Sequence, residues 1–451
     1  MVSNRKTSLI SSSNKILNVR MTDNSPQELY EEYRIDPEKV HRYRSASGEY
    51  NEMLAVTFAR LNGSSVSSDP GKFNIDDMPE IRIRGPTGCG KTTAARNLAV
   101  DIQRAVTLKE TGYPVLDRDG LIEAAQEDGV SFERATEDLL LKDVIQTVSD
   151  ELFGQPDEGL PYFDITLAHA TNPADLKGHP DVNSDGSTQF IEGTMTKAVK
   201  ASKVGPIVLL LDEVNRAPTE GKDELYDALD HRTRVTLEGI RGGQTIEGDN
   251  LNLLAVSTMN YGQGHHVEPM DTAEKRRLGA TFETSYLGYN PNGENTPQPE
   301  VELVADRTPA SETTGEKLVR AANEIRNLAE SDSQVRYGVP TSNVLDWART
   351  AFAYHNAGID DPVLKAGKST VARAIYDHNQ DEVDEVASTL QTEVGSMPFN
   401  AEEHEAWKDD ADRLACEDCS WSAPVDEAPE DAVNFLDCPE CEAGRLSSFN
   451  N

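Results

Sequence analysis

Glycine, lysine and threonine at fixed spacing mark residues 81–95, which read IRIRGPTGCGKTTAA. The glycines of this segment allow a tight turn whose backbone N–H groups point inward at a phosphate. Lys91 would bring a positive charge to the β- and γ-phosphates of a nucleotide, and Thr92 would offer its hydroxyl to Mg²⁺. The pattern therefore predicts a phosphate-binding loop. We assign nucleotide contacts to Gly85, Pro86, Thr87, Gly88, Cys89, Gly90, Lys91, Thr92 and Thr93.

A pair of carboxylates follows the aliphatic run in IVLLLDEVNR, residues 207–216. Such a run is typical of a strand buried on both faces of a parallel sheet, and ligands bind at the C-terminal edge of such sheets. We expect Asp212 to hold Mg²⁺ through its water shell and Glu213 to polarise the attacking water. Asn260 ends a further predicted strand, residues 252–259, and is placed to touch the γ-phosphate or its water.

The sequence also predicts the helices and the linker that surround these residues. Ser25 is expected to cap a helix that extends to Ile35, and a second helix is expected from about residue 50 to residue 61. Residues 62–71 have the composition of a linker. We expect residues 1–20 to be disordered, and Met21 is a possible start of the chain.

The first core strand, residues 81–84, carries Arg82 and Arg84, so one of its faces should meet acidic groups or water. Residues 107–158 are predicted to form acidic helices. A turn is predicted at 172–178, followed by a polar loop that ends at Gly193 before a helix. A hairpin is expected in VTLEGIRGGQTIEG, residues 235–248. Within 316–394, apolar residues at helical spacing predict helices at 316–330, 342–355 and 381–394.

In order along the chain, these features resemble an AAA+ ATPase of the MoxR and dynein-related branch. The resemblance spans residues 81 to about 350. It rests on GPTGCGKT, the turn Asp175-Leu176-Lys177-Gly178, Phe190 and Gly193 before a helix, LLLDEVNRAP, the hairpin, STMN at 257–260 and DTAEKRRL at 271–278. The fold class implied is α/β, a P-loop AAA+ core of parallel sheet flanked by helices, with a helical lid.

The resemblance also implies roles for single residues. Asn260 is similar to the sensor 1 residue, and Arg276 or Arg277 to an arginine finger that reaches the γ-phosphate of a neighbouring subunit. The family's second sensor is a lid arginine, but Asn343 stands at that place here, and Arg336 or Arg349 could substitute. His265 and His266 lie in a segment that departs from the family, and we assign them to a loop rather than to a metal site.

Four cysteines near the C-terminus form two CxxC pairs, Cys416/Cys419 and Cys438/Cys441. Tetrahedral zinc takes two thiolates from each such pair, so the spacing predicts a small zinc ribbon whose metal supplies its folding energy. The domain plan is a tail, helical segment and linker at 1–71, a nucleotide-binding core at 72–315 with an insertion at about 107–158, a lid at 316–395, a linker at 396–412 and the ribbon at 413–446.

The chain of 451 residues carries 79 acidic against 43 basic residues, a formal net charge of -36. Such a charge argues against general binding of nucleic acid or anionic membrane, and it is tolerated where salt screens repulsion. We therefore expect a cytoplasmic protein adapted to high salt. No stretch is long and apolar enough to predict a membrane span.

The favoured hypothesis is a MoxR-like ATPase that uses ATP, Mg²⁺ and Zn²⁺ and assembles into a homo-oligomeric ring, usually a hexamer in this family. It would remodel or activate a protein partner, and members of this branch often act with a von Willebrand factor A domain protein. The alternatives are a restriction-type NTP-driven DNA motor and a nucleotide-switched binding protein whose zinc ribbon contacts the partner. GTP remains open as the nucleotide.

Overall fold

The structure is a computed structural model of the whole chain. It describes residues 24–45, 48–61, 80–115, 117–132, 134–167, 176–182, 188–216, 225, 228–229, 233–237, 244–260, 279–290, 295–331, 335–376 and 379–400, and the backbone alone of 19–21, 413–416, 422–424 and 446–449.

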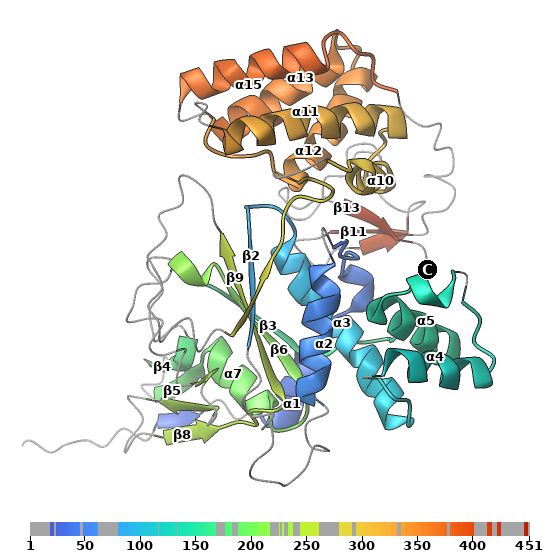
Figure 1. The fold of residues 1–451 in the computed structure, drawn as a ribbon. Coiled ribbons are helices and arrows are strands. Elements are labelled where there is room, and N and C mark those ends of the chain that lie inside the picture. Colours follow the sequence, from blue (N-terminus) through green and yellow to red (C-terminus); the bar gives the residue numbers. More distant parts are fainter. Residues whose placement is uncertain are drawn as a thin grey trace, which may run out of the picture.

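A five-stranded parallel sheet forms the centre of the molecule (Figure 1). Its order is β10 (Ala280–Glu283), β2 (Ile81–Gly85), β9 (Leu253–Asn260), β6 (Ile207–Asp212) and β3 (Tyr162–Thr166). The register sets Gly85 opposite Asn260 and Leu211 opposite Ser257. The ends of β2, β9 and β6 therefore meet at one edge, as the sequence predicts.

Helices cover both faces of this sheet. Successive side chains of a strand point to opposite faces, so its apolar strands present apolar side chains on both. One face packs against α2 (Glu49–Leu61), α3 (Lys91–Glu110) and α5 (Leu141–Phe153), with α4 (Arg118–Glu127) outside α5. The other face packs against α1 (Pro26–Glu32) and α7 (Thr194–Ala201). In β6, Val208 and Leu210 face the first group and Leu209 and Leu211 the second, so a strand buried on both faces is confirmed.

The first predicted helix is confirmed with its cap, since the Ser25 hydroxyl accepts from the Glu28 N–H and the Glu28 carboxylate accepts from the Ser25 N–H. On β2, Arg84 lies 3.2 Å from the Glu283 carboxylate of β10, and Arg82 donates to the Thr281 hydroxyl. The expectation that this face meets acidic groups is thus confirmed for Arg84.

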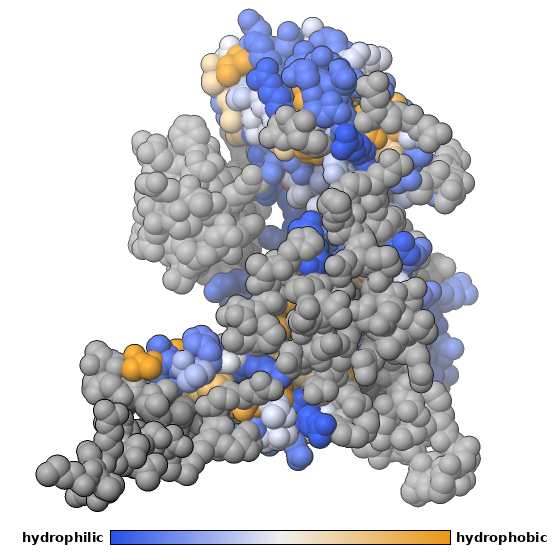
Figure 2. Space-filling model, turned by 90° about the vertical axis from the view of Figure 1, so that its left-hand side faces the viewer, coloured by the Kyte–Doolittle hydropathy of each residue, from blue (hydrophilic) through white to orange (hydrophobic). Residues whose placement is uncertain are grey.

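A second body of helices packs around its own core and is called the helical unit below. It contains α10 (Gln298–Arg307), α11 (Glu312–Glu330), α12 (Thr341–Asn356), α13 (Pro362–Gly367), the π-helical turn η6 (Lys368–Arg373), α14 (Ala374–Tyr376) and α15 (Gln380–Glu393). The predicted helices correspond to α11, α12 and α15, whereas α10 and α13 were not predicted. Hydrophilic residues cover much of the face of this unit shown in Figure 2.

Smaller sheets lie beside the core. β1 (Val19–Met21) pairs in parallel with β5 (Thr188–Glu192), which pairs antiparallel with β4 (Gly178–Val182). The expectation of disorder was therefore wrong for Val19 and Arg20, and the polar segment before Gly193 contains strands. The sequence of β4, GHPDV, gives no alternation that would reveal it. The expected hairpin is confirmed as β7 (Arg234–Leu237) paired with β8 (Gln244–Glu247).

Near the C-terminus, β11 (Arg413–Cys416) pairs antiparallel with both β12 (Ser422–Pro424) and β13 (Leu446–Phe449). Short 3₁₀ turns occur at η1 (Pro37–Lys39), η4 (Thr136–Asp138) and η5 (Val214–Arg216). No described helix is long and apolar enough to cross a membrane.

Candidate active site

The phosphate-binding loop connects β2 to α3 and is shaped by its glycines. Gly90 stands at the N-cap of α3 with φ 90°, a conformation that costs glycine little, and no side chain caps the helix there. At Gly85 an added Cβ would lie 2.8 Å from the Cys89 sulfur and 2.6 Å from a Thr284 methyl. The helix therefore begins with backbone N–H groups and its positive dipole end directed at the loop, which suits an anion.

Lys91 lies within this loop and is only 7% exposed. Its Nζ donates to the carbonyl oxygens of Pro86 at 2.6 Å and of Gly85 at 3.1 Å. Burial lowers the pKa of Lys91, while Cys89, Asp212 and Glu213 oppose that shift. The lysine is thus a buried cation held beside the acidic pair that follows β6.

Asp212 is bound from two neighbouring elements. The Thr92 hydroxyl of α3 donates to Asp212 Oδ2 at 3.3 Å, and the Thr258 hydroxyl of β9 donates to Oδ1. A hydroxyl and a carboxylate are oxygen ligands of the kind that Mg²⁺ takes, often together with substrate phosphates. Thr92 and Asp212 therefore fit the predicted magnesium ligands in chemistry and in proximity.

Glu213 is held in an uncommon backbone conformation, with φ 57° in the left-handed region. Its N–H donates to the Thr258 hydroxyl at 3.0 Å. Asn260 Nδ2 donates to Glu213 Oε1 at 2.8 Å, and Arg216 lies 2.7 Å from Oε2. Non-glycine residues in this region cost free energy and persist where the surroundings hold them, often at functional sites. The carboxylate is accordingly fixed in direction at the edge of the sheet.

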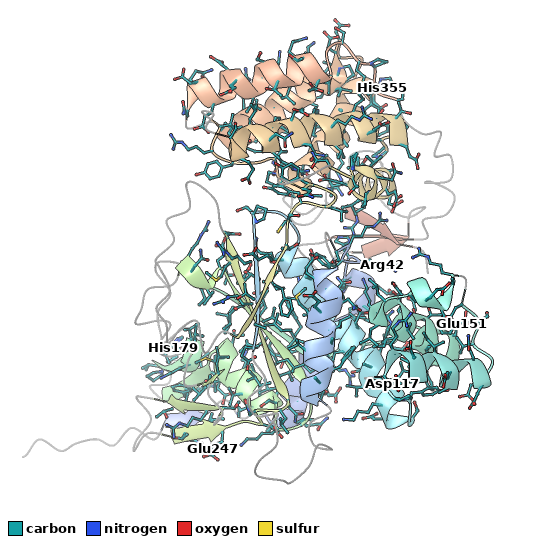
Figure 3. The ribbon with its side chains drawn as sticks, in the orientation of Figure 1. Arg42, Asp117, Glu151, His179, Glu247 and His355 are labelled. Atoms are coloured by element: carbon teal, nitrogen blue, oxygen red, sulfur yellow. The ribbon has the colours of Figure 1, made fainter. Side chains whose placement is uncertain are left out.

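These groups border one cavity of about 390 Å³, a size typical of small-molecule sites. The core contributes Thr87, Gly88, Cys89, Gly90, Lys91, Thr92, Thr93, Asp212, Glu213 and Asn260. Among the described residues the helical unit and the segments leading to it add Ser285, Leu287, Leu303, Arg307, Thr341, Ser342 and Leu345, and the N-terminal segment adds Arg42, Tyr43 and Arg44. Figure 3 shows Arg42 below the helical unit, on the side of α3 and α5.

Of the predicted site residues, the structure thus brings together the loop, Asp212, Glu213 and Asn260, although Gly85 and Pro86 touch Lys91 and do not line the cavity. Arg276, Arg277, His265 and His266 lie outside the described residues, as do the side chains of Cys416, Cys419, Cys438 and Cys441. In the described part of the chain no group of three or more metal-ligating side chains occurs.

The residues considered in place of a lid arginine lie elsewhere. Arg336 contacts the Glu382 carboxylate at 3.0 Å, and Arg349 lies 3.7 Å from Asp346. Neither is among the described residues that line the cavity. Asn343 donates to the Thr370 carbonyl and also does not line it. Arg307, at the last residue of α10, is the basic residue that the helical unit contributes to the cavity wall.

Sequence reasoning missed the N-terminal contribution. The Tyr43 N–H donates to Asn97 Oδ1 of α3 at 2.9 Å, and the Tyr43 hydroxyl donates to the buried Glu49 carboxylate. Arg44 lies 3.3 Å from Glu302 of α10 and also pairs with Asp306. The residues in this segment, HRYRSASGEY, form no known motif, so only the fold reveals their proximity to the loop.

Comparisons with known proteins bear on the residues just described. The family model described as "AAA domain (dynein-related subfamily)" matches residues 149–278, which include Asp212, Glu213 and Asn260. This match and the geometry of the site identify the chain as an ATPase. Its phosphate-binding loop precedes the matched range, but the fold places Thr92 of the loop helix against Asp212.

No curated protein matches the chain. Among solved structures, a crystal structure of a candidate ATPase from Cytophaga hutchinsonii is similar at 16% sequence identity, over 82% of this chain and 86% of that one. The TM-score of this match is 0.30, which is too low for it to carry an argument.

Proposed function

We propose that this ATPase is MoxR-like, binds ATP with Mg²⁺ and works in an oligomeric ring to remodel or activate a protein partner. The observation that supports ATP hydrolysis is the single cavity shared by Lys91, Thr92, Asp212, Glu213 and Asn260. They come from three separate segments of sequence, yet the edge of one parallel sheet brings them together.

Each of these residues has a distinct role in the proposal. Lys91 and the start of α3 neutralise the phosphates, and Thr92 with Asp212 would hold Mg²⁺, whose charge polarises the γ-phosphate. Glu213 accepts a proton from the attacking water, because its carboxylate is the one aimed by Asn260 and Arg216. Asn260 orients Glu213 and the water.

The nucleophilic water and Arg216 compete for the same carboxylate. Glu213 Oε2 lies 2.7 Å from Arg216, and the Arg216 side chain is 39% exposed, so this pair can separate at small cost. Asn260 is 5% exposed and its bond to Oε1 is more firmly held. Hydrolysis in this scheme uses the Oε2 side of the carboxylate while Asn260 keeps Oε1 in place.

The ring part of the proposal rests on Arg276 and Arg277 as fingers that complete a neighbour's site. Mixing an Arg276→Ala/Arg277→Ala protein with a Glu213→Gln protein creates some boundaries that have both a native Glu213 and a native finger. We expect partial recovery of ATPase activity in the mixture. A strictly monomeric protein in sedimentation at molar salt with ATP would contradict the ring.

The C-terminal unit is proposed to bind Zn²⁺ through Cys416, Cys419, Cys438 and Cys441 and to dock the protein partner, with a von Willebrand factor A domain as a candidate. Cys416 ends β11 and is paired with Leu446, the first residue of β13. Along the chain, Cys419 follows this end of β11, and Cys438 and Cys441 precede β13, which supports one shared site. Metal analysis of the purified chain should find about one zinc per chain.

The decisive experiment compares Glu213→Gln with Glu247→Gln, a carboxylate-to-amide change at an exposed position of β8. Glu213→Gln should retain ATP binding and lower kcat by about 10²–10⁴, the usual contribution of a general base. Glu247→Gln should hydrolyse ATP at the wild-type rate. Native turnover by Glu213→Gln would refute this assignment of the site.

A further inference from the structure

A buried ion pair lies in the helical unit behind the cavity wall. Glu300 of α10 is 0% exposed and Arg326 of α11 is 1% exposed. Arg326 Nη1 donates to Glu300 Oε2 at 2.7 Å, and Nη2 donates to Oε1 at 2.9 Å. The two charges therefore meet in a two-point arrangement that fixes the guanidinium plane.

The same guanidinium holds the turn that precedes α12. Arg326 Nε donates to the Val339 carbonyl at 2.9 Å. Its plane lies over the Tyr286 ring, 4.1 Å from the ring centroid, and the Tyr286 hydroxyl donates to the Gly338 carbonyl at 3.3 Å. The backbone at 338–339 is thus fixed by the arginine and by the aromatic ring on which it stacks.

Glu300 extends this network to the cavity. The Thr341 hydroxyl, at the first residue of α12, donates to Glu300 Oε1 at 2.7 Å. Thr341 and Ser342 both line the nucleotide cavity. The ion pair does not reach the cavity itself, but one hydrogen bond connects it to a residue of the wall.

The wall also contacts the phosphate-binding loop directly. A Cβ added to Gly88 would lie 2.5 Å from Pro340 Cβ and 3.2 Å from the Ser342 hydroxyl. The loop and the N-terminus of α12 are therefore in van der Waals contact, and a displacement of the turn at 338–341 moves groups that face the loop. No side chain caps α12, which leaves its first backbone N–H groups at the same wall.

A buried ion pair is a costly way to stabilise a helical unit. Desolvation offsets much of the attraction, and well-packed apolar residues of similar volume often stabilise a core equally well. Burial opposes the charge of Arg326, but the Glu300 carboxylate outweighs it and raises the pKa of Arg326, so the guanidinium stays charged. Beyond stability, the pair fixes positions. The guanidinium of Arg326 holds Glu300 and the Val339 carbonyl, and Glu300 in turn holds Thr341.

We propose that Arg326 is a positioning residue for ATP binding and hydrolysis. Through Glu300 and the Val339 carbonyl it holds the N-terminus of α12 against the phosphate-binding loop, so that Thr341 and Ser342 form a fixed wall for the nucleotide. This inference rests on the proposed nucleotide site and assigns a role to residues that do not touch ATP.

The test uses Thr341→Val, which keeps the shape of the side chain and removes only the hydroxyl that donates to Glu300. Thr370→Val is the matched control, because Thr370 donates to the Ala366 carbonyl in the same helical unit at 2.9 Å and does not line the cavity. Binding of a fluorescent ATP analogue, ATPase kinetics and Tm are measured for both full-length variants.

We expect Thr341→Val to raise the Kd and KM for ATP about tenfold, the scale of one hydrogen bond to a charged group. Thr370→Val should stay within about twofold of wild type at a similar shift in Tm. Arg326→Lys, which keeps the charge and loses the two-point fork, should raise KM in the same direction. A merely structural pair would lower Tm in these variants without a selective change in KM.

The outcomes separate this inference from the proposed function. If wild-type protein binds ATP and Lys91→Ala abolishes that binding, but Thr341→Val and Arg326→Lys bind ATP as wild type does, the positioning role is refuted alone. If wild-type protein binds no ATP, the nucleotide site itself is refuted, and the positioning role fails with it.

Discussion

The two walls of the nucleotide cavity are built on different principles. The core wall consists of the phosphate-binding loop, the start of α3 and polar groups at the ends of strands. Several of these groups touch one another, as Asn260 touches Glu213 and Thr92 touches Asp212. The wall from the helical unit presents Leu303, Arg307 and Leu345, with its ion pair buried behind it. In our proposal the chemistry belongs to the core, and the helical unit sets the shape of the site.

The walls also differ in how much they can change without loss of the reaction. In the proposed function the core groups act on phosphate or water, so removing one should remove a step. Groups of the helical unit act through position, so a substitution there should change affinity more than the rate of the chemical step. The predictions below test this division.

The largest effect is expected at Lys91. Lys91→Ala removes the buried cation of the loop, and the cavity then faces the phosphates with Asp212 and Glu213 at its edge. ATP binding should weaken by at least about 10²-fold, since a charged contact in a low-dielectric site is lost. Isothermal titration with ATP and Mg²⁺ measures it. Unchanged affinity would show that phosphate binds elsewhere.

Asn260→Ala should have the next largest effect, and mainly on kcat. Without Asn260 Nδ2, Glu213 Oε1 loses its partner on β9 and the carboxylate can turn towards Arg216. We expect kcat to fall by about 10- to 100-fold, within the range for loss of one positioned group, with the Kd for ATP nearly unchanged. Equal losses in kcat and in ATP affinity would contradict the proposed division of roles between the two walls.

Arg307→Ala tests the opposite wall. We expect the Kd for ATP to rise about tenfold through loss of one charge-assisted contact, with kcat at saturation falling less. The matched control is Arg320→Ala, because Arg320 is an exposed cation of the same helical unit, paired with Glu316 at 2.5 Å and absent from the cavity lining. If Arg307→Ala lowered kcat more than Asn260→Ala does, the helical unit would take part in the chemistry.

The core wall was predictable from sequence because each of its groups follows a recognisable local pattern. The loop has its glycines and GKT, Asp212 and Glu213 follow an aliphatic run, and Asn260 ends a strand. Parallel strands bring such ends to one edge, so their proximity follows from the fold class alone. The positive φ of Glu213 was not predictable, since no glycine or asparagine marks the position.

The wall from the helical unit could not be predicted from the sequence. It takes two residues from α10, three from α12 and two from the segment after β10. The four-residue spacing of Leu303 and Arg307 is also that of ordinary helix packing. Glu300 and Arg326 are separated by 26 residues on amphipathic helices that contain other acidic and basic residues. Their pairing depends on the crossing of α10 and α11, which local sequence does not specify.

The smallest effects are expected from salt, which acts on both walls. Exposed ion pairs such as Arg44 with Glu302 contribute only about 0–1 kcal/mol each, so screening them costs little. Self-repulsion from a net charge of -36 has the greater influence on stability, and screening relieves it. The thermal unfolding midpoint should therefore rise by several degrees as the KCl concentration increases. Most of the rise is expected between about 0.1 and 1 M, where the Debye length falls from about 10 Å to 3 Å.

ATP affinity should respond to the same salt series in the opposite direction. Screening weakens the attraction of phosphate to cations, more for the half-buried Arg307 than for the buried Lys91, because buried charges are screened less. Arg307→Ala should accordingly reduce the salt dependence of the Kd, whereas Arg320→Ala should leave it as in wild type. Titrations at several KCl concentrations provide the slopes. An unfolding midpoint that is flat or falls with salt would refute the adaptation to high salt, while equal slopes in wild type and Arg307→Ala would place Arg307 away from the bound phosphates.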